Sequence, residues 1–193
     1  MIEVELRGQL TKEQFEKLEN FLKEHGSFKE FQDREMFLLY DYAGYSKDFT
    51  MRDIDIRLRN TNGNCEIMMK RKIGDDTTAR KEISVPLKDT TLDNVKEIIK
   101  ALGCSKALWM HRVKNSYMYE GSEWSCIVAP NKNGEDIYFY EVEREVSSLD
   151  DIQNTKEILK SQSKAFHLPI LKGDEARAFI HTLDTQVNKV VEL

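Results

Sequence analysis

Charged side chains alternate with apolar ones along several short segments of this chain, and this period of two most limits the fold. In the segment EVELR, Glu3, Glu5 and Arg7 alternate with Val4 and Leu6. Successive side chains of a β-strand point to opposite faces, so a strand here would carry all three charges on one face. Taken alone, this segment indicates a strand whose polar face lies in water, because charged residues are mostly exposed.

The alternation recurs in later segments, and its charges are mainly Arg, Lys and Glu. These segments carry Asp55, Arg57 and Arg59; Glu66, Met68, Lys70 and Lys72; Arg80, Glu82 and Ser84; Arg112, Lys114 and Ser116; and Glu141, Glu143 and Glu145. Two geometries are compatible with the pattern: an open sheet with its charges in solvent, or a closed sheet with the charges inside. Isolated buried charges are costly, so the closed form requires a wet, internally paired interior. Such an interior would suit a polyphosphate held by Arg and Lys, together with Mg²⁺ or Mn²⁺ held by carboxylates.

Helix and strand signals are interleaved along the chain, which predicts an α+β protein. Thr11 and Gln14 form a capping box before a helix that stops at Gly26, and Asn62-Gly63 is a strong hairpin signal. Strands are expected at 2–7, 36–42, 51–60, 65–73, 79–87, 107–119, 123–129 and 137–146, and helices at 11–25, 90–103, 148–162 and 174–186. Tight turns join most strands, which indicates an antiparallel sheet that is closed or nearly closed, with helices outside. No Pro-, Gly- or Ser-rich linker divides the chain, so residues 1–193 are expected to form a single domain.

Composition excludes several classes of function. The net charge of −5 disfavours nucleic acid and anionic membranes as partners. Cys65, Cys104 and Cys126 are widely spaced, which indicates reduced thiols and a cytoplasmic location. The sequence contains neither an 18-residue apolar run nor a G-x-x-x-x-G-K-[ST] phosphate loop.

Six of the segments resemble, in order, the motifs of the CYTH, or triphosphate tunnel metalloenzyme, superfamily. EVELR resembles the E-x-E-x-K signature of that family, and IRLR at 56–59 resembles its Leu-Arg-x-Arg strand. The other matches are EIMMK at 66–70, ARKE at 79–82, HRVKNSY at 111–117 and YEVE at 140–143. The resemblance spans about residues 2–145. It implies a closed eight-stranded antiparallel β-barrel, or tunnel, with helices packed outside, which binds triphosphate groups together with Mg²⁺ or Mn²⁺.

The resemblance also implies roles for individual residues. Metal would be held by Glu3, Glu5, Glu141 and Glu143, and phosphates by Arg7, Arg57, Arg59, Lys70, Arg80, Arg112 and Lys114. In some members a Lys–Tyr pair activates the attacking water, and Lys70 and Tyr40 occupy comparable places. The implied activity is metal-dependent hydrolysis of inorganic tripolyphosphate or a small organic triphosphate. A class IV-type adenylyl cyclase and a non-catalytic polyphosphate-binding protein remain alternatives, and the chain is expected to be a monomer or a homodimer.

The chain departs from the family pattern at two places. Arg7 replaces the lysine of the first strand, so a planar guanidinium stands where a compact ammonium is usual. The segment EWSCIVA lacks the aspartate that many members supply for metal; Cys126 or a neighbour takes its place, with Glu120 and Glu123 nearby. The cation set is therefore better preserved than the metal set, and binding is better supported than turnover.

Overall fold

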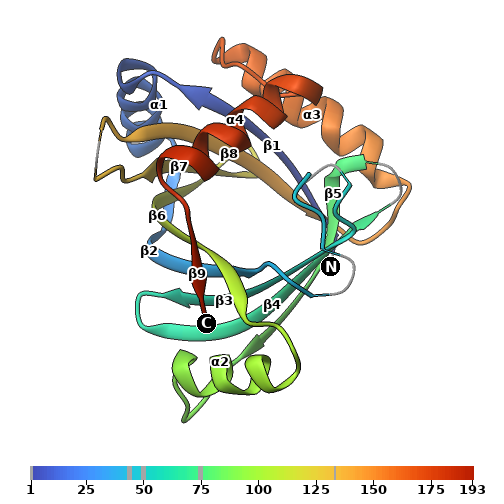
Figure 1. Cartoon of the computed structure of the whole chain (residues 1–193). Coiled ribbons are helices and arrows are strands. Elements are labelled where there is room, and N and C mark those ends of the chain that lie inside the picture. Colours follow the sequence, from blue (N-terminus) through green and yellow to red (C-terminus); the bar gives the residue numbers. More distant parts are fainter. Residues whose placement is uncertain (1, 43–44, 49–50, 74–75, 133) are drawn as a thin grey trace.

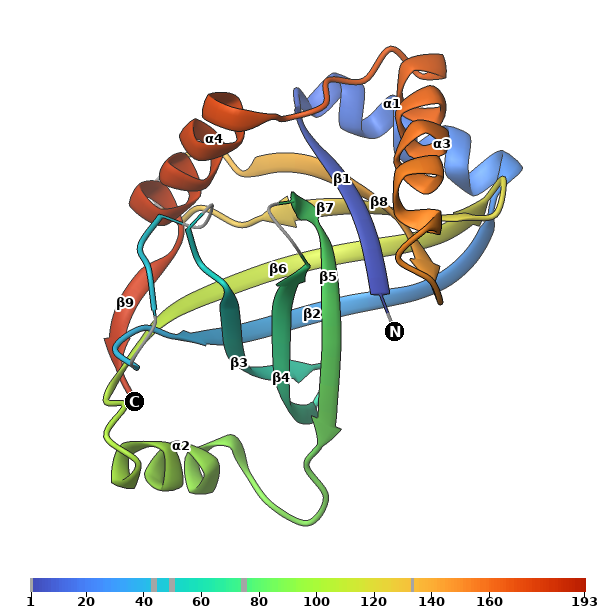
Figure 2. The same cartoon turned by 90° about the vertical axis from the view of Figure 1, so that its right-hand side faces the viewer.

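Eight antiparallel strands close into a ring in this computed structural model, which describes residues 2–42, 45–48, 51–73, 76–132 and 134–193 (Figures 1 and 2). The strands are β1 (Ile2–Leu10), β2 (Ser27–Leu39), β3 (Ile54–Thr61), β4 (Asn64–Ile73), β5 (Asp76–Pro86), β6 (Lys106–Tyr119), β7 (Ser122–Ala129) and β8 (Ile137–Val146). Their order is β2-β3-β4-β5-β1-β8-β7-β6, and pairing between β2 and β6 closes the ring. The predicted fold class is confirmed.

Three helices cover the outer face of the ring. Figure 1 shows α1 (Lys12–His25) and α3 (Asp151–Ala165) on one side and α2 (Leu92–Ala101) on the opposite side. The apolar halves of the alternating segments face these helices: Val4 and Leu6 of β1 pack with Leu22 of α1, and Leu58 of β3 packs with Val95 of α2. Because the apolar side chains lie outside the ring and beneath helices, the charged side chains of the same strands face inward. Among the described helices, none combines the length and the apolar composition needed to cross a membrane.

Several strand ends differ from the predicted bounds, and the differences are largest in two strands. Strand β2 begins at Ser27, well before the predicted start at 36, because its polar first half pairs with β6 from Ser27 opposite Met118 onward. A further strand, β9 (Lys189–Glu192), was not predicted and pairs with residues 106–109 of β6. Helix α3 also begins at Asp151 instead of 148, with Asp150 as its N-cap residue. In β2 and β9, pairing with β6, which is distant in sequence, stabilises the extended conformation, and local propensity does not.

A fourth helix, α4 (Gly173–Gln186), lies across one end of the ring (Figures 1 and 2). The segment before it crosses β1, where Leu171 N donates to Arg7 O at 2.9 Å. Gly8 permits this close crossing, because a Cβ there would lie 2.0 Å from the carbonyl oxygen of Pro169. Phe179 and Leu183 of α4 pack against side chains of β7 and β8. Helix α4 therefore lies at the β7–β8 side of one mouth of the ring and contributes to the lining of its interior, while the other three helices cover the wall.

Candidate functional site

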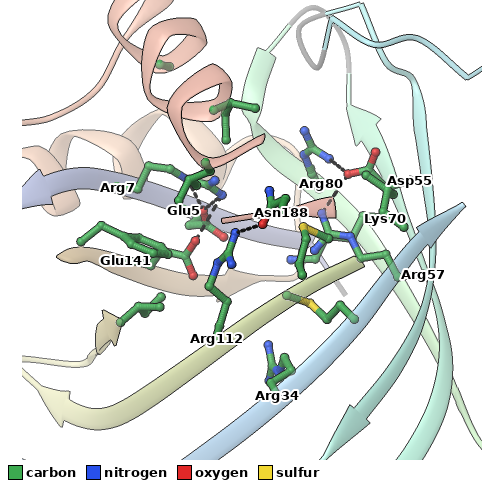
Figure 3. A pocket seen from close by; sticks show the side chains of 18 of the residues that line it. Glu5, Arg7, Arg34, Asp55, Arg57, Lys70, Arg80, Arg112, Glu141 and Asn188 are labelled. Atoms are coloured by element: carbon green, nitrogen blue, oxygen red, sulfur yellow. Dashed lines mark hydrogen bonds and ion pairs between the residues drawn. The ribbon is translucent and has the colours of Figure 1, made fainter. Parts of the chain in front are cut away.

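The interior of the ring collects the charges that alternate along the strands. A cavity of about 220 Å³ lies inside it. Ten residues with predicted site roles line this cavity: Glu3, Glu5, Arg7, Arg57, Arg59, Lys70, Arg80, Arg112, Lys114 and Glu141. Figure 3 shows several of these side chains converging from different strands. Of the two geometries that the sequence left open, the structure therefore has the closed one.

Three carboxylates from β1 and β8 form a cluster suited to a hard cation. Each of Glu3, Glu5 and Glu143 offers an oxygen, and these oxygens lie within 4.8 Å of one another. The pairing of β1 with β8 creates the cluster by placing Glu5 opposite Glu143. Burial and the neighbouring carboxylates raise the pKa of Glu143 to about 7 and also raise the pKa of Glu3. These three residues could hold Mg²⁺ or Mn²⁺, which would relieve the repulsion between them.

The fourth predicted metal residue, Glu141, lies apart from that cluster. One of its carboxylate oxygens is 3.3 Å from Nη2 of Arg7, which also pairs with Glu5. The pKa of Glu5 is lowered: burial acts to raise it, but the positive charges of Arg7 and Lys70 outweigh that effect. Arg7 thus connects the carboxylate cluster to the remaining glutamate of β8.

Strand β7 supplies Glu123 and Ser125 to the interior, at the place where the expected aspartate is missing. Cys126 does not lie there, because it packs into the outer core beneath the helices. Ser125 lies opposite Glu141 in the β7–β8 pairing, and Glu123 lies opposite Glu143. Glu123 is buried, ion-paired with Lys29, and 3.5 Å from Nζ of Lys114. An acid is therefore present on β7, but two lysines neutralise it.

Asp55 is the centre of a saturated ion-pair network on β3 and β5. Its oxygens lie 3.1 Å from Arg52, 2.9 Å from Arg57 and 2.8 Å from Arg80, and its side chain is 3% exposed. Burial acts to raise the pKa of this carboxyl, but the three guanidinium groups lower it below its usual range. The protein itself therefore neutralises much of the positive charge on this wall. Among the described residues, no acceptor lies within hydrogen-bond distance of the buried Nε of Arg57.

Lys70 and Arg59 also have acidic partners. Nζ of Lys70 lies 3.1 Å from Glu3 and is ion-paired with Glu82. Burial acts to lower the pKa of Lys70, but Glu3 and the other nearby carboxylates raise it overall, which favours the ammonium form. Nε of Arg59 lies 2.6 Å from Glu66.

Arg34 of β2 is a lumen residue that sequence reasoning missed, and it lies opposite Arg112 of β6 in the pairing that closes the ring (Figure 3). Arg34 donates to Thr61 Oγ1 at 3.2 Å and to Gln32, and Arg112 donates to Asn188 Oδ1 at 2.8 Å. Burial lowers the pKa of both guanidinium groups to about 10. Within the part of the chain that the structure describes, no carboxylate forms an ion pair with either of them. Like charges directly opposite each other on neighbouring strands are unfavourable, so an anion bound between Arg34 and Arg112 would reduce their repulsion.

A sequence signal for Arg34 exists in the first half of β2. Glu30, Gln32 and Arg34 alternate there just as charges do in the other strands. The residues between them are not consistently apolar, however, so the pattern by itself does not indicate a half-buried strand.

Tyr40, predicted to act with Lys70, follows the end of β2. Its ring centroid lies 4.9 Å from that of Tyr45, and Lys47 Nζ lies 5.7 Å from its centroid. Tyr40 and Glu143 are the two predicted site residues that are not among the described residues lining the cavity. Glu143 nevertheless lies next to the lining residues Glu3 and Glu5 in the carboxylate cluster. The catalytic role of Tyr40 stays a prediction.

This ring of inward-facing charges is the architecture of a known family, and the chain belongs to it: the CYTH domain model matches residues 1–172. The fold is similar to that of the PH1819 protein from Pyrococcus horikoshii OT3, with a TM-score of 0.72, 23% identity, and coverage of 93% of this chain and 99% of that one. It is also similar to HpAC1 from Hippeastrum, an adenylyl cyclase candidate described as having a dominant triphosphatase activity. In that case the TM-score is 0.59, the identity 15%, and the coverage 89% and 90%. No curated protein sequence matches this chain.

Proposed function

We propose that this protein is a metal-dependent triphosphatase that holds its substrate inside the ring. One observation carries the proposal: the tunnel holds both a carboxylate cluster and a pair of guanidinium groups, Arg34 and Arg112, that form no ion pair with any acid among the described residues. A triphosphate bound with a divalent cation has the complementary charges, because its oxygens suit arginine forks and its metal suits carboxylates. Membership of the CYTH family and the activity described for the Hippeastrum protein support the same substrate group.

The donor set fits a divalent cation of the Mg²⁺ or Mn²⁺ type. Glu3, Glu5 and Glu143 offer oxygen ligands, and the pKa values of Glu3 and Glu143 are raised because burial and the neighbouring carboxylates disfavour their charged forms. When bound, such a cation would neutralise charge on phosphate oxygens and make the terminal phosphorus easier to attack.

The residues of the chain would bind and orient the phosphates. Arg34 and Arg112 would donate hydrogen bonds to oxygens of the phosphate nearest to β2 and β6. The Nε–H of Arg57, which has no acceptor among the described residues, would donate to a neighbouring phosphate. Lys70, held as an ammonium, would stabilise charge on the group being transferred. In hydrolysis, the oxygen of water forms a bond to the terminal phosphorus and the bridging P–O bond breaks. The leaving diphosphate takes the electron pair, and the water protons pass to orthophosphate and solvent.

The proposed function is tested by incubating the protein with tripolyphosphate, thiamine triphosphate and ATP, each with Mg²⁺ or Mn²⁺. We expect metal-dependent release of orthophosphate from at least one of them. Formation of cyclic AMP from ATP would instead identify a cyclase, and tight binding without product would identify a binding protein. Either result would overturn the hydrolase proposal.

A matched pair of variants on β8 tests the metal assignment. Glu143→Gln removes one carboxylate of the cluster, and we expect it to lower metal-dependent turnover by roughly two orders of magnitude. Glu145→Gln, an exposed residue two positions further along the same strand, serves as the control and is expected to retain activity. If both variants were fully active, the carboxylate cluster would not be the metal site.

A further inference from the structure

Hydrogen bonds connect the C-terminal end of α4 to Arg112 through one asparagine. Nη2 of Arg112 donates to Oδ1 of Asn188 at 2.8 Å, a bond that Figure 3 shows, and Nδ2 of Asn188 donates to Asp184 at 2.7 Å. All three residues line the cavity, and Asn188 is buried. The segment that carries Asp184 and Asn188 therefore contacts one of the two arginines that form no ion pair with an acid among the described residues.

The two neighbours of the Asn188 amide fix its orientation. A guanidinium has only donors and a carboxylate only acceptors, so the amide must turn Oδ1 to Arg112 and Nδ2 to Asp184. The backbone of Asn188 is held as well, because its N–H donates to Leu183 O at 2.8 Å and β9, which follows directly, pairs with β6. Asn188 therefore presents a neutral acceptor to Arg112 from a fixed position.

Arg112 keeps its charge in these contacts. Its Nη1 donates to the carbonyl oxygen of His111 at 2.6 Å, so among the described residues both acceptors bonded to this side chain are neutral. A guanidinium has more N–H donors than two acceptors use, which leaves donors for an anion. Burial lowers the pKa of Arg112 to about 10, and Glu141 and Asp184 oppose this effect, so the side chain is charged at neutral pH. Asp184 acts on that charge from a distance, because the amide of Asn188 lies between them.

We propose that Asn188 is a positioning residue of the phosphate site: its neutral amide orients Arg112 towards the ligand without neutralising it. The inference rests on the proposed function, and it extends the site to residues beyond 172, where the match to the CYTH domain ends. A carboxylate in the same place would form an ion pair with Arg112, as Asp55 does with Arg57, and would compete with the anion. An amide holds the guanidinium by a weaker hydrogen bond, so its attraction for a phosphate remains.

Exchanging the acid and the amide tests the inference at constant net charge. The double variant Asp184→Asn with Asn188→Asp keeps a donor and an acceptor at the two positions but places the carboxylate against Arg112. We expect this variant to be at least as stable as the wild type and its affinity for tripolyphosphate to fall about 10- to 100-fold. Calorimetry with EDTA present measures the affinity without hydrolysis, and thermal unfolding measures the stability. If Asn188 had only a structural role, the affinity would not change, because the hydrogen bonds are conserved.

The same exchange on the outer surface is the matched control. Asp150 and Asn154, at the start of α3, have the same spacing in sequence as Asp184 and Asn188, and both are exposed. The double variant Asp150→Asn with Asn154→Asp is expected to bind tripolyphosphate as the wild type does.

A double-mutant cycle keeps the inference testable if the exchanged variant does not fold. Asn188→Ala should lower the affinity of the otherwise wild-type protein for tripolyphosphate by about threefold or more, because Arg112 loses its orientation. When Arg112→Met is already present, Asn188→Ala should have no further effect, because the group that it positions is gone.

Two outcomes would overturn the inference alone, provided that the wild type binds tripolyphosphate and releases phosphate from a triphosphate when metal is present. One is an unchanged affinity in the exchanged variant. The other is additive losses in the cycle, which would show that Asn188 does not act through Arg112. If the wild type neither bound tripolyphosphate nor released phosphate, the inference and the proposed function would both be wrong.

Discussion

Two groups of arginines in the tunnel differ in how their charge is balanced. On β3 and β5, Arg57 and Arg80, together with Arg52, share the buried carboxylate of Asp55. On β2 and β6, Arg34 and Arg112 lie opposite each other and are held only by neutral acceptors such as Thr61 Oγ1 and Asn188 Oδ1 among the described residues. Asp55 neutralises the first group, whereas no acid among the described residues forms an ion pair with the second.

The difference separates cations that maintain the tunnel from cations that are available to a ligand. Removing one partner of a buried ion pair leaves an uncompensated charge, so the Asp55 network contributes to stability as long as it is complete. A buried cation without an acid costs folding energy and recovers it only when an anion binds. Motif positions alone do not reveal this distinction, because Arg57 and Arg112 both belong to segments that resemble family motifs.

The largest effect is expected from breaking the saturated network. Asp55→Asn leaves three guanidinium groups around a neutral amide, so we expect the free energy of unfolding to fall by about 3 kcal/mol. Urea denaturation measures this value. Asp53→Asn, an exposed residue two positions earlier, is the control and should change it by less than about 0.5 kcal/mol. A similar small effect in both variants would mean that the network does not stabilise the protein.

Removing a charge from the Arg34–Arg112 pair should affect ligand binding and not lower stability. Arg34→Met removes a desolvated charge, so the ligand-free protein should be as stable as the wild type or more stable. The affinity for tripolyphosphate should fall about 10- to 100-fold, since a charged hydrogen bond is worth about 1.5–3 kcal/mol. Calorimetry and thermal unfolding measure the two quantities.

Arg71→Met, an exposed residue on β4, is the control for Arg34→Met and should leave the affinity unchanged. A large loss of stability in Arg34→Met without loss of affinity would assign Arg34 to the structural group.

The pH dependence of stability sharpens the comparison further. The folded-state pKa of Asp55 lies below its ordinary value of 3.8, so its contribution to stability is present above that pH and is lost as the pH falls towards the folded-state pKa. We expect the difference in unfolding free energy between wild type and Asp55→Asn to be constant from pH 7 to 5 and to shrink on acidification below about 4. Urea titrations at pH 7, 5 and 3.5 measure it, and a difference that persists unchanged at pH 3.5 would contradict the assignment.

The smallest effect concerns anions in the absence of metal. Tripolyphosphate with EDTA should raise the melting temperature of the wild type by a few degrees, because it binds only the folded state. In Arg34→Met the rise should be much smaller, and high salt should reduce it in both proteins. An equal rise in both proteins would show that the anion binds outside the arginine pair.

Most of the ring could be predicted from the sequence, because charged and apolar side chains alternate along several of its strands. In β1, for example, the sequence alone assigns Val4 and Leu6 to one face and Glu3, Glu5 and Arg7 to the other, whichever strand lies beside it. The part of β2 before residue 36 alternates polar side chains without an apolar opposite face, β9 is too short to show a period, and each depends on pairing with β6. Arg34 was missed for that reason: its strand is extended only because a distant segment lies beside it.

What the sequence by itself determined is the separation of charged from apolar side chains, since the two-residue period of a strand is local. The tertiary structure decided that the charged face is the inner one, by closing β2 on β6 and covering the apolar face with α1, α2 and α3. It also decided which arginines are neutralised and where α4 lies, because ion pairs and helix packing join residues far apart in the chain. A local pattern carries no information about such contacts.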